Sequence, residues 1–171
     1  MEALKLLVDK LSQYNFLTNI LPGTVLCLIL KHSGYDVISF DNWYLTGIVF
    51  YFIGMVNNRF SSLVIEWICK KIHFITFAPY KSFVIAEKKD SKIATLSMEN
   101  NIFRSYISVF TLSLIALLYK TLSYKITFLV QYQDVMLLVC LLVLFGFSYR
   151  KQTNYIRKRV EANQQSPQKF G

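Results

Sequence analysis

Five polar side chains recur between residues 58 and 73 at spacings of four, four, four and three, which places them on one face of a helix. Glu66 and Lys70 in this stripe form a favourable pair one turn apart. The stripe has two interpretations: the wet side of a helix on the membrane surface, or the lining of a wet vestibule between subunits. It consists of Asn58, Ser62, Glu66, Lys70 and His73.

Other polar groups lie within or beside apolar runs, where they are costly and therefore informative. The pair Pro22-Gly23 predicts a kink or break, with freed carbonyls that need partners. This is either an interfacial helix over 1–20 that turns at Pro22, or a broken helix that lines an ion path. Glu66 could pair with Arg104 or Arg59. The candidate pore-lining or interhelical polar residues are Asn19, Pro22, Asn58, Ser62, Glu66 and Arg104.

The sequence has no arrangement typical of an enzyme or a metal centre. Three cysteines without a CxxC pair and two histidines are too few ligands, at the usual spacing, for a zinc site. P-loop, GxSxG, HExxH and GxGxxG motifs are absent from the sequence. No internal inverted repeat is visible, which counts against a transporter. We therefore expect a non-enzymatic protein with no catalytic residue, no metal and no cofactor.

Four runs without a charged residue must position these groups, namely 11–30, 42–58, 105–119 and 135–149. Hydrophobic residues make up 54% of the chain and charged residues only 17%, too few for the polar surface of a soluble fold. Basic residues at the edges of the shorter runs can snorkel toward the headgroups. We expect an all-α integral membrane protein, whose four-span domain 1–149 has transmembrane helices over about 16–34, 43–60, 103–122 and 128–149.

The distribution of Lys and Arg predicts the orientation. Two in the N-terminal segment, eight in the 57–104 loop and six in the tail make 16 of the 19 basic residues. A multi-pass topology with both termini inside places all of these in the cytoplasm. The helical insert 61–101 and the basic tail 150–171 are then cytoplasmic.

The insert and the tail carry the candidate contacts to a partner or to lipid, which are Lys88, Lys89, Arg157, Lys158 and Arg159. The first half of the insert continues the second span, Pro79 interrupts the helix, and a second helix runs from about Ser82 to Asn100. The basic part of the tail is expected to be helical near anionic lipid and its end disordered. Nucleic acid is an unlikely partner.

Two further predictions concern helix ends and helix packing. Asp134 can cap the N-terminus of the fourth span, because a carboxylate accepts from the free N–H groups there. Gly47 and Gly54 lie seven residues apart on one face of the second span, where they could allow a close helix contact.

Three segments of the chain, YNFLTNILPG at 14–23, AEKKD at 86–90 and NNIFRS at 100–105, carry a resemblance. They resemble small multi-spanning inner-membrane proteins of bacterial anti-phage defence operons, including accessory proteins of RNA-targeting CRISPR systems. The resemblance covers about the first 120 residues. It implies a homo-oligomeric antiviral effector that perturbs or permeabilises the inner membrane when triggered, or else an anchor that recruits or senses a soluble defence protein.

Overall fold

The computed structural model describes residues 13–35 and 42–164, and every secondary-structure element in these residues is helical. Four continuous helical runs, Gln13–His32, Trp43–Lys71, Lys92–Ser123 and Gln133–Gln164, are long and apolar enough to cross a membrane. The all-α class with four candidate membrane-spanning helices is therefore confirmed. The expected N-terminal interfacial helix falls largely within residues 1–12, and the expected disordered end within 165–171, both outside the described residues.

The first run is not broken at Pro22, so of the predicted kink or break the break is wrong, whereas the predicted need of a freed carbonyl for a partner is confirmed. A π-helical segment, η1 (Phe16–Ile20), leads directly into α2 (Leu21–His32), and Pro22 lies in the first turn of α2. Pro22 has no N–H to offer to the carbonyl four residues earlier, that of Thr18. The hydroxyl of Ser105 donates to this carbonyl at 3.4 Å. The helix stays continuous because a neighbouring helix supplies the missing donor.

The second run extends well beyond the expected span. It comprises α3 (Trp43–Phe60), the π-helical η2 (Ser61–Ile65) and α4 (Glu66–Lys71), which confirms that the insert begins as a continuation of this helix. It ends where His73 adopts a left-handed backbone with φ 58° and the N–H of Phe74 bonds to the carbonyl of Cys69. His73 therefore lies past the helix end, and its predicted place on the polar stripe is wrong.

The second half of the insert differs from the prediction. Helix α5 spans Tyr80–Lys89, directly after Pro79, and ends at Asp90, whose extended backbone breaks the helix. The Asp90 carboxylate accepts from the N–H of Lys92 at 2.9 Å, and α6 then runs without interruption from Lys92 to Ser123. The separate helix over Ser82–Asn100 and the span 103–122 are thus replaced by a shorter α5 and a longer α6.

The fourth run also begins later and ends later than expected. A short helix, α7 (Thr127–Gln131), is followed by Tyr132 and then by α8 (Gln133–Gln164). Residues 128–132 therefore do not belong to the fourth span. Asp134 is the second residue of α8 rather than its cap. The basic part of the tail is helical up to Gln164, as expected.

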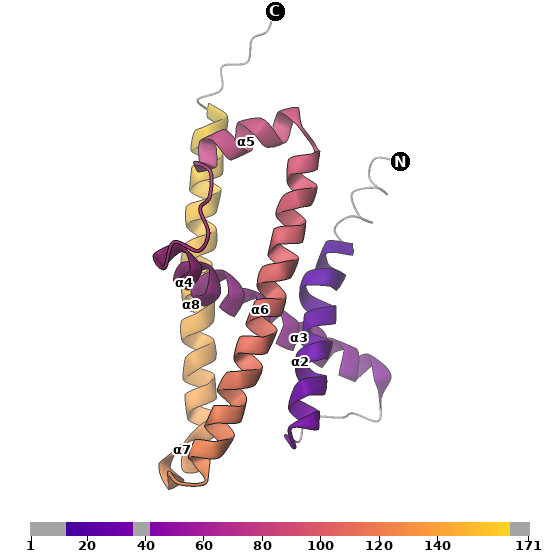
Figure 1. The fold of residues 1–171 in the computed structure, drawn as a ribbon, viewed down its shortest axis with the longest axis vertical. Coiled ribbons are helices and arrows are strands. Elements are labelled where there is room, and N and C mark those ends of the chain that lie inside the picture. Colours follow the sequence, from indigo (N-terminus) through magenta and orange to yellow (C-terminus); the bar gives the residue numbers. More distant parts are fainter. Residues whose placement is uncertain (1–12, 36–41, 165–171) are drawn as a thin grey trace, which may run out of the picture.

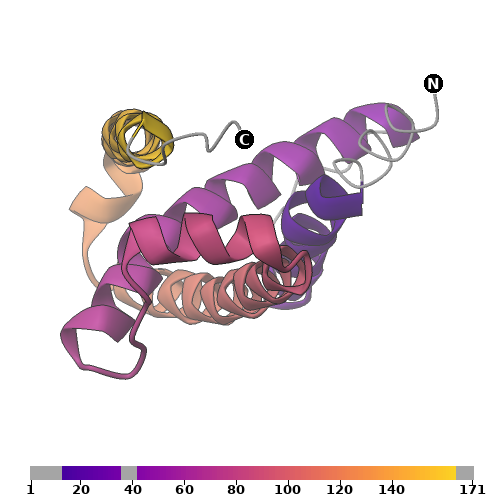
Figure 2. The same ribbon diagram turned by 90° about the horizontal axis from the view of Figure 1, so that it is seen from above.

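The helices form an open bundle in which one long helix crosses the others (Figures 1 and 2). Helices α6 and α8 both run along the long axis and are joined at one end through α7, while α5 lies across their other ends (Figure 1). Seen down this axis, α6 and α8 lie on opposite sides of the helix from α3 to α4 (Figure 2). Figure 2, which looks down this axis, shows the helix from α3 to α4 running diagonally across the molecule. The crossing brings η2 and α4 against both α6 and α8.

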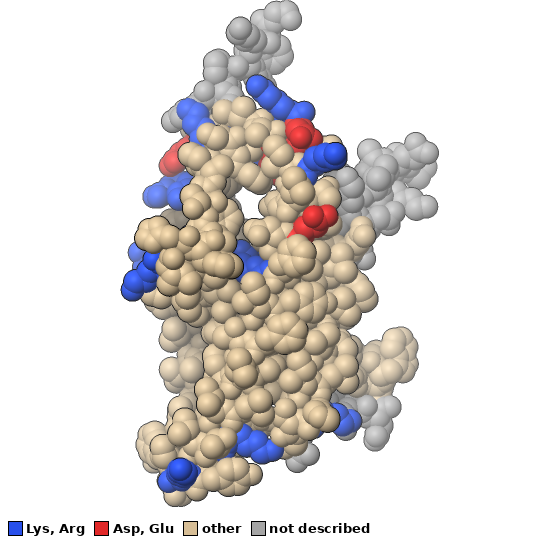
Figure 3. Space-filling model, viewed as in Figure 1, with Lys and Arg blue, Asp and Glu red and all other residues tan. Residues whose placement is uncertain are grey.

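On the face shown in Figure 3, uncharged surface covers much of the lower half of the molecule, with basic side chains at the lower end and both basic and acidic side chains toward the upper end. The apolar part of α8 is also mostly exposed, because only 6% of its most apolar window is buried. Leu137 and Leu142 are 60% and 76% exposed. An apolar surface of this extent requires lipid or another protein surface to cover it.

Candidate functional site

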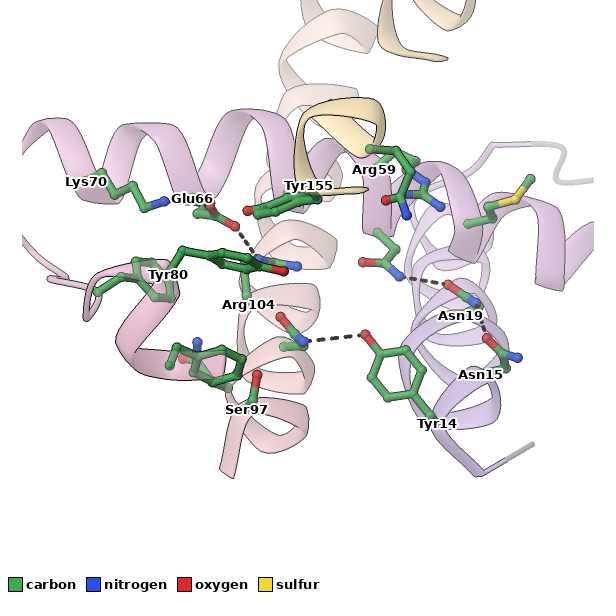
Figure 4. A pocket seen from close by; sticks show the side chains of 18 of the residues that line it. Tyr14, Asn15, Asn19, Arg59, Glu66, Lys70, Tyr80, Ser97, Arg104 and Tyr155 are labelled. Atoms are coloured by element: carbon green, nitrogen blue, oxygen red, sulfur yellow. Dashed lines mark hydrogen bonds and ion pairs between the residues drawn. The ribbon is translucent and has the colours of Figure 1, made fainter. Parts of the chain in front are cut away.

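A cavity of about 620 Å³ lies at the end of the bundle that carries α5, and its lining is mainly polar (Figure 4). The polar stripe of the second run forms one wall, since Asn58, Ser62, Glu66 and Lys70 all line it. Residues from η1, α5, α6 and α8 supply the other walls. The stripe thus lines a hollow within one chain. The sequence-predicted residues that meet here are Asn19, Asn58, Ser62, Glu66, Arg104 and Lys158.

Glu66 is the centre of an ionic cluster in this cavity. Its carboxylate is nearly buried, with 7% of the side chain exposed, and it faces three cations from three helices. The ammonium of Lys70 lies 2.8 Å away and that of Lys151 lies 3.3 Å away. Arg104 binds the second carboxylate oxygen, which confirms the predicted pair with Glu66 (Figure 4). The cluster therefore joins α4, α6 and α8.

The π-helical segment η2 supplies the remaining acceptors of the cluster. The guanidinium Nε of Arg104 donates to the hydroxyl of Ser61 at 3.0 Å. The ammonium of Lys151 donates to the hydroxyl of Ser62 at 2.8 Å and to its backbone carbonyl. A π-turn does not repeat the α-helical bonding pattern, so its carbonyls can be offered to side chains. The irregular helix is thus part of the site.

The cluster carries more positive than negative charge. Its one carboxylate, that of Glu66, faces the ammonium groups of Lys70 and Lys151 and the guanidinium of Arg104. One carboxylate against three cations leaves a positive charge at this end of the molecule.

A layer of amide and hydroxyl groups joins the first, second and third helical runs next to the cavity residues Asn19 and Asn58. Asn58 donates to the side-chain oxygen of Asn19 at 3.1 Å. The fully buried amide of Asn57 donates to the hydroxyl of Ser105 at 3.0 Å, and the hydroxyl of Ser108 donates to the Asn57 carbonyl at 3.1 Å. Sequence analysis missed Ser105 and Ser108, although serines three apart in an apolar run are a usual sign of a helix interface.

Replacing Ser105 by alanine is expected to destabilise the fold by about 2 kcal/mol, because the Asn57 amide loses an acceptor and the Thr18 carbonyl loses its donor. Ser113→Ala is the matched control on the same helix. Ser113 is equally buried, but its hydroxyl bonds only to the carbonyl of Val109 in its own helix. Thermal unfolding in detergent measures both, and equal losses would contradict an interhelical role for Ser105.

A close glycine contact lies next to this layer. A Cβ on Gly23 would meet the carbonyl oxygen of Phe50 at 2.0 Å, and a Cβ on Gly54 would meet that of Asn19 at 1.8 Å. The first two helical runs therefore touch through their backbones. The predicted close helix contact is thus confirmed at Gly54 and wrong at Gly47, where no described atom lies within 4 Å of a Cβ. Gly54 packs on Gly23, beside the buried Pro22, which does not line the cavity.

The predicted partner-contact residues are divided among three surroundings. Lys88 binds the side chain of Asn163 at 2.8 Å and Arg159 binds Glu87 at 3.0 Å, so both attach α5 to α8. Lys158 lines the cavity. Lys89 and Arg157 are exposed, and Arg157 pairs only with Glu161 in its own helix, at 3.6 Å. Contact with a partner or lipid stays a prediction for these residues.

The arrangement suits the binding of an anion and the retention of water. Cationic and amide donors line the cavity, and among residues 13–35 and 42–164 no three His, Cys, Asp or Glu side chains come together as a metal would require. The chain matches no protein-family model, and no curated protein or solved structure matches it.

Proposed function

We propose that this chain is a non-enzymatic membrane protein of bacterial antiviral defence, which assembles into a homo-oligomer and permeabilises the inner membrane when triggered. The main support is the polar cavity at one end of the bundle, whose lining residues Asn19 and Asn58 are sequence neighbours of the tightly packed Asn57 layer and Gly23–Gly54 contact. In this proposal the cavity serves as a vestibule and the tight helix packing as its closed constriction. The resemblance to defence-operon proteins supplies the biological setting.

Two features support assembly and rearrangement. Four helices are too few to enclose a wide aqueous path, so a pore needs several copies. The apolar part of α8 is covered by little of its own chain, which leaves it available to pack on another copy. Movement of α8 would also open the cavity. Lys151 of α8 pairs with Glu66 on the cavity wall, so movement of this helix would break a contact that holds the wall together.

Release of a trapped ionic dye from liposomes tests the proposed permeabilisation. Release by the reconstituted protein is expected to rise more steeply than linearly with its density in the membrane, since several copies must meet. Asn58→Leu is expected to lower release at least about fivefold, because it places an apolar side chain on the polar wall. The matched control is Met55→Leu, which introduces leucine at a cavity residue that is already apolar. It should leave release unchanged. Absence of release at any density would contradict the proposal.

The proposed location is the inner membrane with both termini in the cytoplasm. Its support is the excess of Lys and Arg in the segments assigned to the inside. Reporters active only in the cytoplasm, fused at either terminus, are expected to be active, and the same reporter inserted between α6 and α8 is expected to be silent. An active insert with silent termini would reverse the orientation.

The alternative function is a membrane anchor that recruits or senses a soluble defence protein. The observation that favours it is the exposure of Lys89 at the end of α5, on the surface that carries the cavity mouth. Lys89→Glu is expected to abolish capture of the partner by the solubilised protein. Lys88→Glu is a poorer test because it also breaks the contact with Asn163.

A further inference from the structure

The charge on the cavity wall is unbalanced. Among the described residues, four cations line it, namely Arg59, Lys70, Arg104 and Lys158, against the one carboxylate of Glu66. That carboxylate is already engaged by Lys70, Arg104 and Lys151 and cannot neutralise the others. We propose that the cavity is a binding site for a phosphate-bearing anion. A ligand for this cavity goes beyond the proposed membrane activity and does not depend on it.

Two of the four cations are free to contact a ligand. In the described part of the chain, neither Arg59 nor Lys158 makes a hydrogen bond or an ion pair, although both line the cavity. They come from different helices, α3 and α8. Figure 4 shows Arg59 above the space between Tyr155 and Asn19. Isolated cations that converge on one cavity are suited to share an anion between them.

The rest of the wall favours phosphate over a simple halide. Asn58, Asn100 and Asn101 add amide donors to the guanidinium and ammonium groups, and phosphate oxygens accept several such bonds at once. Tyr80 and Tyr155 are neighbours, with ring centroids 6.1 Å apart, and offer an aromatic surface to the organic part of the ligand. A volume of about 620 Å³ lies within the usual range for small-molecule sites.

The phosphate could belong to a soluble molecule or to a lipid headgroup, since the chain has four candidate membrane-spanning helices. Two arms of one experiment separate these sources. In the first, inorganic pyrophosphate is titrated into the full-length protein in an uncharged detergent and followed by calorimetry. In the second, native mass spectrometry measures retention of phosphatidylglycerol compared with phosphatidylcholine. Saturable binding is expected in at least one arm, and the arm identifies the source.

The double variant Arg59→Gln/Lys158→Gln tests whether the bound anion lies in the cavity. It is expected to weaken binding at least about tenfold, because a hydrogen bond to a charged group is typically of this strength. Neither side chain makes a hydrogen bond or an ion pair in the described part of the chain, so folding should be retained. The control Lys89→Gln/Arg157→Gln removes the same charge outside the cavity and should bind as the wild type does.

Two results would overturn the site. One is the absence of saturable binding in both arms. The other is an equal loss of affinity in the cavity variant and the control, which would indicate general attraction to a basic protein. Phosphate binding without dye release would support this site and contradict the proposed permeabilisation. Dye release without phosphate binding would support the permeabilisation and contradict this site.

Discussion

Gly54→Ala is expected to lower the free energy of unfolding by about 3 kcal/mol, at the upper end of the cost of overpacking. The new methyl group would lie 1.8 Å from the carbonyl oxygen of Asn19, and further backbone atoms of Asn19 follow within 3 Å. A backbone cannot turn away as a flexible side chain does, so the first two helical runs must separate. Separation also disturbs the Asn19–Asn58 hydrogen bond beside the contact.

Gly47→Ala is the matched control, because Gly47 lies two turns away on the same helix with open space around its Cβ. It should be neutral or slightly stabilising, since alanine favours the helix. Thermal unfolding followed by size-exclusion fluorescence in one detergent compares the two variants. Equal melting temperatures for Gly54→Ala and Gly47→Ala would show that the runs do not touch at Gly54.

Glu66→Gln is expected to destabilise the protein by about 3 kcal/mol, the range found when one member of a buried ion pair is removed. Glutamine keeps the shape and an acceptor oxygen, but it leaves Lys70, Arg104 and Lys151 without a counter-charge. Loosening of α8 should follow, because Lys151 is a main polar link from that helix to η2 and α4.

The control for this change is Glu87→Gln, which removes a carboxylate from the exposed pair with Arg159. Exposed pairs of this kind contribute about 1 kcal/mol or less. Thermal unfolding in detergent compares the two variants, and equal losses would contradict a role of the Glu66 charge in holding the cluster together.

The sequence was sufficient to predict the fold class and part of the site. Charge-free runs determine the number of candidate spans, because the hydrocarbon thickness leaves few alternatives. The four-residue spacing of Asn58, Ser62, Glu66 and Lys70 placed one wall of the cavity correctly, because a helix converts that spacing into a face. The Glu66–Arg104 pair followed from the high cost of leaving either charge alone at that depth.

The remaining features depend on contacts that no local pattern contains. Lys151 belongs to a basic tail whose simplest interpretation was attraction to lipid, and only the crossing of the second run with α8 brings it to Glu66. The contact of Gly23 with Gly54 joins residues 31 positions apart on different helices. A kink or break was expected at Pro22. The hydroxyl that donates to the Thr18 carbonyl belongs to Ser105, which is distant in sequence, so the local pattern could not predict that the helix stays continuous.

The π-turn at 61–65 has a consequence for changes in chain length. A π-turn holds one residue more than the α-helical turn it replaces, so removal of one residue there can yield an ordinary helix whose two ends keep their facing directions. Deletion of Leu63 or Val64, which line no part of the main cavity, should therefore be tolerated. One residue added within α3 would instead rotate everything beyond it by about 100° and turn Glu66 away from Arg104. Natural variants of this chain that lack one residue of this helix should lack it at this turn.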